Sequence, residues 1–272
     1  MTAEKTCKIG FIGAGNMAYA ICKSIINAGL YSSEEISIYD VDLHRLNIFK
    51  DEFSVNVDES NSSLTRKTQC IILAVKPQHI AQVLDEIQPN VRESQLIISI
   101  AAGISTKYIE TRLGKAIPVI RTMPNTPLMY GAGTTALCKG QYANDKHLEF
   151  AQKLFRSAGL TLVVEEEMMD AITALSGSGP AYFFYLVEAM IQSAIELGLD
   201  AELAKKLSAN TGLGAMKMLM QSQSDPQELR RRVTSPGGTT ESAISVLEAE
   251  NVKRSFIEAI KSAAKRSKQL GL

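Results

Sequence analysis

The chain has 272 residues, and its 29 lysines and arginines balance 29 aspartates and glutamates, so its formal net charge is zero. A protein that binds nucleic acid or an acidic membrane nonspecifically carries a clustered excess of basic residues, which this chain lacks. Apolar residues make up 45% of the sequence, enough for a sizeable core, which excludes an intrinsically disordered chain. We expect one large or two modest folded domains with no nucleic-acid partner.

The cysteines and histidines are too scattered to form a metal site. The sequence has four cysteines and three histidines, with no Cys-x-x-Cys pair among them. We expect reduced thiols in a cytoplasmic protein and no bound metal. The residues concerned are Cys7, Cys22, Cys70, Cys138, His44, His79 and His147.

No segment is typical of a secreted or membrane protein. Residues 1–8 are polar, unlike the basic and then apolar start of a secretion signal. The longest uninterrupted apolar run, 181–187, is seven residues long, whereas about 20 residues are needed to span a bilayer. We therefore expect no membrane partner.

The first 165 residues alternate short β-branched runs with segments of helical length. The runs lack polar alternation, which is typical of strands buried on both faces of a parallel sheet. Helices between them, such as 17–28 and 80–87, would cover the two faces. The predicted strands are 7–12, 36–39, 70–75, 96–100, 119–122 and 160–164.

After residue 165 the β-branched runs end, and stretches rich in Ala, Leu, Met, Glu and Lys follow. They predict an all-helical region with interruptions near 177–180, 198, 225–226 and 235–238. One predicted helix, 180–195, is apolar around most of its circumference, so it needs cover from more than one side. We predict an α/β domain over 1–165 and a helical domain over 166–272, which finds its remaining cover in a second copy of the chain.

A glycine-rich turn follows the first predicted strand and precedes a helix. In such a turn the first glycine allows a tight bend, the second lets the backbone approach a pyrophosphate, and a small third residue lets the helix pack on the strand. The helix start then offers unpaired N–H groups to the phosphates. An ordinary glycine turn is the alternative, but the position after the first strand of an alternating chain favours a Rossmann-type dinucleotide site. Its residues are Gly13, Ala14, Gly15, Asn16, Met17 and Ala18.

The second predicted strand ends at Asp40, 25 positions after Gly15. A carboxylate there accepts hydrogen bonds from both hydroxyls of the adenine ribose and repels a 2′-phosphate, which favours NAD over NADP. Two alternatives remain open. Asp40 caps the next helix, or His44 or Arg45 turns round to bind a phosphate.

Other strand ends supply further candidates, because ligands bind beyond the carboxyl ends of the strands in an open parallel sheet. Lys76 precedes a proline at a strand end, and we favour a ribose or phosphate contact there over a catalytic acid. Asn125 lies between two prolines and is suited to the nicotinamide amide, with a rigid turn as the alternative. The candidates are Ala74, Val75, Lys76, Pro77, Ala102 and Asn125.

A second loop, Ser235-Pro-Gly-Gly-Thr-Thr240, opens a predicted helix. Its glycines let N–H groups converge and its threonines add hydroxyl donors, so it is suited to a small carboxylate, with plain helix capping as the alternative. Hydroxyacid dehydrogenases of similar organisation carry a lysine and an asparagine where this chain has Phe183 and Val187. A ketone or alcohol needs that proton transfer, whereas an imine can arrive already protonated.

Over essentially its whole length the chain resembles the pyrroline-5-carboxylate reductases. The resemblance rests on five motifs, of which the last two together are specific: 10–17, 74–77, 123–127, 175–182 and 233–240. It implies hydride transfer from NADPH or NADH to the imine carbon of 1-pyrroline-5-carboxylate, giving L-proline in the last step of proline biosynthesis. It also implies a homodimer with interlocked helical domains, in some members assembled into a larger ring such as a decamer.

By position, the resemblance also implies roles for single residues. Many members carry a small or polar residue, often followed by Arg, where this chain has Asp40 and Val41, so we predict that NADH competes well with NADPH. Glu166 falls where the family has an acidic residue near the substrate, although a register shift would exchange it with Glu165 or Glu167, and a charged hinge is the alternative. The implied cofactor contacts are Gly13 to Met17, Asp40, Asn61, Val75, Lys76 and Ala102. The implied substrate contacts are Ser235, Gly238, Thr239 and Thr240, with the Thr240 hydroxyl the partner of the ring nitrogen.

Two other functions remain open on the sequence alone. The chain could reduce a different cyclic imine acid, such as a six-membered piperideine carboxylate. Alternatively, it could be a non-catalytic nicotinamide-binding regulator, against which the retained glycine and threonine loops argue.

Overall fold

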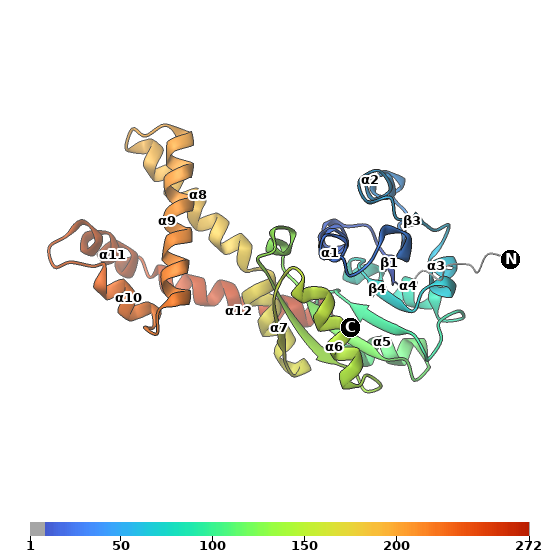
Figure 1. The fold of residues 1–272 in the computed structure, drawn as a ribbon. Coiled ribbons are helices and arrows are strands. Elements are labelled where there is room, and N and C mark those ends of the chain that lie inside the picture. The colour runs from blue at the N-terminus through green and yellow to red at the C-terminus, as the bar shows by residue number, and fades with distance from the viewer. Residues whose placement is uncertain (1–8, 272) are drawn as a thin grey trace. The chain divides into compact units, whose positions relative to one another are not determined.

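The computed structural model describes residues 9–271 (Figure 1). By compactness the chain divides into two units. The first contains the residues up to Ser178 and those from Ser262 onward, and the second contains Gly179–Lys261. We call them the sheet unit and the helical unit. The predicted domain boundary after residue 165 differs from this division by compactness and stays a prediction.

The sheet unit is built on eight strands in the order β3-β2-β1-β4-β5-β6-β7-β8. All neighbouring pairs are parallel except β6 and β7, which are antiparallel. This order places β1 between β2 and β4, at the point where the strand order reverses. The strands are β1 (Ile9–Ile12), β2 (Ile36–Tyr39), β3 (Asn56–Val57), β4 (Cys70–Leu73), β5 (Leu96–Ser99), β6 (Val119–Met123), β7 (Gly133–Lys139) and β8 (Gly159–Val163).

Helices cover both faces of the sheet, as the uniformly apolar strands predict. Successive side chains of a strand point to opposite faces. Ile72 of β4 accordingly packs into one buried cluster with α1, α2 and α6, while Ile71 and Leu73 pack into a second cluster with α3, α4 and α5. The helices are α1 (Asn16–Asn27), α2 (Leu43–Phe53), α3 (Asn61–Lys67), α4 (Ile80–Ile87), α5 (Thr106–Leu113) and α6 (Asp145–Arg156).

Two strands are absent from the prediction. β3 has only two residues, too few for a pattern to show. β7 has the sequence GTTALCK, in which threonines and a small alanine replace the β-branched apolar run of a buried parallel strand. Its antiparallel pairing with β6 places it in the sheet. Residues 7 and 8 of the first predicted strand lie outside the described residues.

Beyond β8 the described chain is helical, as predicted. Pro180 is the second residue of α8, which follows closely on a short helical segment, residues 169–177. The first half of α8 exposes large aromatic rings in the single chain: Phe183 is 56%, Phe184 63% and Tyr185 70% exposed. The elements are η4 (Glu166–Met168), α7 (Met169–Ile172), the π-helix η5 (Thr173–Gly177), α8 (Gly179–Glu196), α9 (Ala201–Gln221), α10 (Pro226–Arg232), α11 (Thr239–Ala249) and α12 (Val252–Leu270). In the part of the chain that the structure describes, no helix combines the length and apolarity needed to cross a bilayer.

Three cysteines are free thiols in the core of the sheet unit. Cys22, Cys70 and Cys138 are all buried, and burial raises the pKa of Cys22 and of Cys138 to about 12. Since the thiolate is the reactive form, these thiols should be inert in the folded protein.

We expect iodoacetamide at pH 8 to modify none of these three cysteines in the native protein and all of them in guanidinium chloride. Peptide mass spectrometry before and after denaturation measures this directly. Rapid native labelling of Cys22 would show that the core around α1 opens far more readily than its burial indicates.

Candidate active site

The glycine turn follows β1 directly, at the point where the strand order reverses. Gly13 has φ +102°, and a Cβ at this position would lie 2.7 Å from the carbonyl oxygen of Ala74. Its amide donates to the carbonyl oxygen of Tyr39 at 2.8 Å. Both the backbone conformation and the lack of space therefore require glycine here.

Gly15 has the opposite surroundings. A Cβ built on it meets no atom within 4 Å, although the residue caps the start of α1, and no side chain satisfies the amides there. Ala18, one turn on, is fully buried and lets α1 pack closely on the sheet. The turn thus offers open space in front of unpaired N–H groups, an arrangement that fits the pyrophosphate of a dinucleotide.

Asp40 closes the turn from the side of β2. Its Oδ2 accepts from the amide of Ala14 at 2.6 Å, and its Oδ1 accepts from the amide of Asp42 at 2.9 Å. The cap of α2 is Asp42, which accepts from the amides of His44 and Arg45. Asp40 is therefore not a helix cap, and its carboxylate stands beside the turn, where an adenine ribose would lie.

Arg45 also contacts the turn. Whether its side chain turns toward a bound phosphate was an open alternative on the sequence alone. Its Nε donates to the carbonyl oxygen of Ala14 at 2.8 Å, and its Nη2 donates to Oδ1 of Asn16 at 2.9 Å. A cation and a carboxylate thus flank the same turn.

The end of β4 meets the turn at the same edge. The amide of Ala74 donates to the carbonyl oxygen of Ile12 at 2.8 Å, and a methyl group of Val75 lies beside Gly13. Lys76 follows as an exposed residue, and Pro77 begins the short helix η2 (Pro77–His79). The structure therefore brings the predicted residues from Gly13 to Met17, Asp40, and Ala74 and Val75 together at one sheet edge.

Two predicted cofactor contacts have partners inside the protein. Asn61 begins α3, and its Nδ2 donates to Oε2 of Glu86 at 2.6 Å while its Oδ1 is buried without a hydrogen-bond partner. Asn125 is 9% exposed; its Oδ1 accepts from the amide of Thr134 at 2.8 Å, and its Nδ2 donates to the carbonyl oxygen of Ser176 at 3.2 Å. Their contacts with a cofactor stay predictions.

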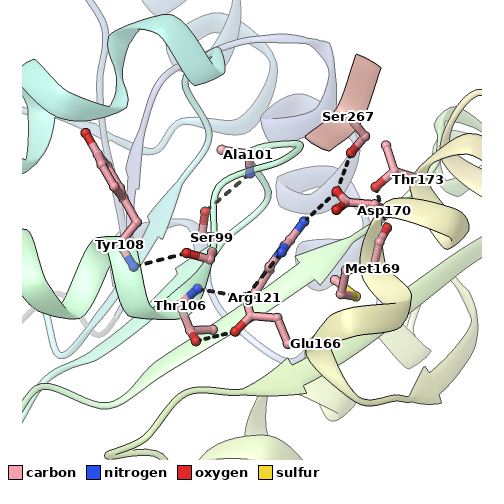
Figure 2. A network of polar contacts seen from close by, with 11 residues as sticks. Ser99, Ala101, Thr106, Tyr108, Arg121, Glu166, Met169, Asp170, Thr173 and Ser267 are labelled. Atoms are coloured by element: carbon pink, nitrogen blue, oxygen red, sulfur yellow. Dashed lines mark hydrogen bonds and ion pairs between the residues drawn. The ribbon is translucent and has the colours of Figure 1, made fainter. Parts of the chain in front are cut away.

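Glu166 is held by the sheet unit (Figure 2). Its Oε1 accepts from the amide of Thr106 at 2.8 Å and from Nη1 of Arg121 at 3.2 Å, and its Oε2 accepts from the Thr106 hydroxyl at 2.6 Å. Arg121 is only 5% exposed and also pairs with Asp170 at 3.6 Å. Arg121 was not among the sequence-based candidates, although an arginine inside an apolar strand signals a buried partner.

The second loop lies in the helical unit and leads into α11. Gly237 has φ +70°, and its amide donates to Oε2 of Glu241 at 2.7 Å. Gly238 is the cap residue of α11 and has no side-chain cap. Capping by a serine or threonine is thus not what this loop provides, and Thr239 and Thr240 stand in the first helical turn.

Charged residues that were not among the sequence-based candidates precede this loop in the chain. Three arginines end α10 immediately before it, and each pairs with a glutamate. Within the loop itself, the Gly237 amide is already paired with the Glu241 carboxylate of the first turn of α11. The arginine pairs are Arg230 with Glu248, and Arg231 and Arg232 with Glu228.

In residues 9–271 no group of three or more His, Cys, Asp or Glu side chains gathers in a way that could hold a metal ion.

Comparison with known proteins matches both parts of the chain. Residues 166–270 match the family model "Pyrroline-5-carboxylate reductase dimerisation", and residues 8–103 match "NADP oxidoreductase coenzyme F420-dependent". A pyrroline-5-carboxylate reductase of Pseudomonas aeruginosa is 39% identical to this chain over 97% of the length of both proteins. One of Methanosarcina acetivorans is 38% identical over 97% of this chain and 98% of its own length. The solved structure of the Plasmodium falciparum pyrroline carboxylate reductase with NADP bound has a TM-score of 0.91 at 32% identity, covering 98% of this chain and 99% of its own.

The sheet order and the glycine turn at the strand reversal define an NAD(P)-dependent oxidoreductase with a Rossmann-type domain and a helical dimerisation domain. Sequence identity of 38–39% to two pyrroline-5-carboxylate reductases over 97% of this chain identifies the family within this class of oxidoreductases. The chain belongs to the pyrroline-5-carboxylate reductase family.

Proposed function

We propose how this chain carries out the reaction of its family, the NAD(P)H-dependent reduction of 1-pyrroline-5-carboxylate to L-proline that ends proline biosynthesis. The observation that carries the proposal is the turn at Gly15, where open space lies before unpaired N–H groups at the sheet edge. When bound there, NAD(P)H supplies the hydride that reduces the imine carbon.

The sheet unit binds and orients the cofactor in this proposal. Amides of the turn hold the pyrophosphate, and Asp40 accepts from the adenine ribose on one side of the turn. On the other side, the loops that follow β4, β5 and β6 hold the nicotinamide half. The residues to which we assign these contacts are Gly13, Ala14, Gly15, Asn16, Met17, Asp40, Asn61, Ala74, Val75, Lys76, Pro77, Ala102 and Asn125.

The loop before α11 holds the substrate. Ser235, Gly238 and Thr239 supply hydroxyl and amide donors for the carboxylate, and the Thr240 hydroxyl contacts the ring nitrogen. Positioning is the chief contribution of these groups, because an imine protonated at nitrogen accepts hydride without a strong acid. Glu166 is a further candidate for substrate contact by its position in the family, and a bound substrate would have to compete for its carboxylate with Thr106 and Arg121.

Steady-state oxidation of NADH and NADPH by the purified protein tests this function. We expect turnover with 1-pyrroline-5-carboxylate, and a lower kcat/KM with the six-membered piperideine carboxylate. A higher kcat/KM with the six-membered ring would identify piperideine carboxylate as the substrate instead. Cofactor binding with no oxidation would indicate the regulator instead.

Cofactor choice provides a test of Asp40. Asp40→Ser removes the charge that opposes a 2′-phosphate and leaves Arg45 in place, so the ratio of kcat/KM for NADPH to that for NADH should rise about 10-fold. Asp51→Ser removes an equal charge from an exposed position on α2 and should leave the ratio unchanged. A large NADPH preference already present in the unmodified protein and unaltered by Asp40→Ser would rule out this role.

The dimerisation model supports a homo-oligomer. We propose a homodimer as the basic assembly, with a ring such as a decamer built from dimers. The exposed rings of Phe183, Phe184 and Tyr185 on α8 support burial against another copy. Light scattering measures the mass in solution, and a monomer at micromolar concentration would contradict the dimer.

The buried free thiols support a reducing compartment such as the cytoplasm.

A further inference from the structure

The last turn of α12 packs directly on the loop between β5 and α5. Gly103 in this loop has φ +77°, and a Cβ there would lie 2.5 Å from the carbonyl oxygen of Ser267 and 2.9 Å from the amide nitrogen of Gly271. A Cβ on Gly271 would in turn collide with the carbonyl oxygen of Gly103. Two glycines thus allow the two backbones to touch.

A chain of polar contacts also joins the last turn of α12 to the start of α5, which follows this loop (Figure 2). The Ser267 hydroxyl donates to Oδ1 of Asp170 at 2.7 Å, and Asp170 pairs with the buried Arg121. Arg121 pairs with Glu166, which accepts two hydrogen bonds from Thr106 at the start of α5. The end of α12 and the start of α5 are therefore tied to one buried guanidinium.

The other end of the loop is fixed as well. The Ser99 hydroxyl at the end of β5 accepts from the amide of Ala101 at 3.3 Å, and the carbonyl oxygen of Ser99 accepts from the Thr122 hydroxyl of β6 at 3.1 Å. The loop between these anchors carries Ala102. Only the contact with α12 comes from a segment distant in sequence that follows the helical unit.

We propose that the final turn of α12 is a positioning element for the nicotinamide half of the cofactor, with Ser267 and Gly271 as its positioning residues. The inference rests on the proposed function, because it takes the carboxyl edge of β5 as part of the cofactor site. In a doubly wound sheet one nucleotide lies on each side of the strand reversal. The side of β2 and Asp40 takes the adenine nucleotide, and the side of β4 and β5 takes the nicotinamide nucleotide. A displaced Ala102 loop therefore weakens one half only.

Two variants test this at the docked turn. Gly271→Ala places a methyl group against the Gly103 carbonyl, where it can displace the last turn of α12 without entering the core of the sheet unit. Ser267→Ala removes the hydrogen bond to Asp170. Gln269→Ala and Ser262→Ala are the matched controls, since both side chains are exposed on α12.

We expect each test variant to raise the KM for NADH about 3- to 10-fold, the effect of one lost or strained contact. The inhibition constant of ADP, which fills only the adenine side, should stay within about 2-fold, and both controls should match the unmodified protein. An equal rise for ADP would show general destabilisation, and no rise for either variant would show that the docked turn has no part in cofactor binding; both outcomes overturn the inference. Absence of turnover in the unmodified protein would instead overturn the proposed function.

Discussion

Replacing Gly15 by valine is expected to weaken NADH and NADPH binding about 100-fold or more while the protein stays folded. Gly15 has φ −70° and ψ 177°, an extended conformation that valine adopts readily. Its Cβ would meet no protein atom, so the added side chain fills only the space assigned to the pyrophosphate. Fluorescence titration of NADH measures the binding, and calorimetry should place the unfolding midpoint within about 2 °C of the original.

Gly13→Ala is the informative contrast, because even a smaller added side chain at this position meets the protein and not the space assigned to the ligand. A Cβ on Gly13 meets the carbonyl group of Ala74, and the φ of +102° strains any L-residue. We expect the free energy of unfolding to fall by about 2–4 kcal/mol. If Gly15→Val binds NADH normally, the pyrophosphate does not lie at this turn.

Thr240→Val should give the second large effect, a loss of about 10- to 100-fold in kcat/KM for 1-pyrroline-5-carboxylate. The variant keeps the shape of the side chain and removes the hydroxyl assigned to the ring nitrogen, and a hydrogen bond to a charged group is worth about 1.5–3 kcal/mol. We expect both a raised KM for the imine and a lowered kcat, with an unchanged dissociation constant for NADH. Stopped-flow binding and steady-state rates separate these quantities.

Thr111→Val is the matched control, since this threonine is exposed on α5 and has no assigned role. It should leave all three constants unchanged. Activity of Thr240→Val equal to that of the control would remove the hydroxyl from the reaction and leave the backbone amides of the loop as the substrate contacts.

The parts of the fold and site that local pattern encodes could be predicted from sequence. Gly13 and Gly15 are read from their spacing after an apolar strand, and the structure gives each the separate surroundings that their roles require. The helical second part follows from composition. β7 could not be predicted, because its residues carry no apolar periodicity and its place comes from pairing with β6 and β8.

The polar network around Arg121 shows the same limit for side chains. The sequence of β6 indicates that the charge of Arg121 is buried, but it does not indicate which residues pair with it. Glu166 reaches Thr106 across 60 positions, and Ser267 reaches Asp170 across 97. The local sequence around these residues does not indicate which of them will be in contact. The role of Glu166 in holding the sheet unit together is therefore visible only in the folded chain. The same holds for Arg45, whose contact with the turn depends on how α2 leaves β2.

The return of the chain to the sheet unit at Ser262 has a consequence for biosynthesis. The segment that docks on Gly103 is synthesised only after the whole helical unit has been made. The nucleotide-binding unit therefore cannot be completed while the helical unit is still being translated, although most of its residues emerge first. At that stage the nascent chain would carry a formed sheet with an unfinished edge at the β5 loop.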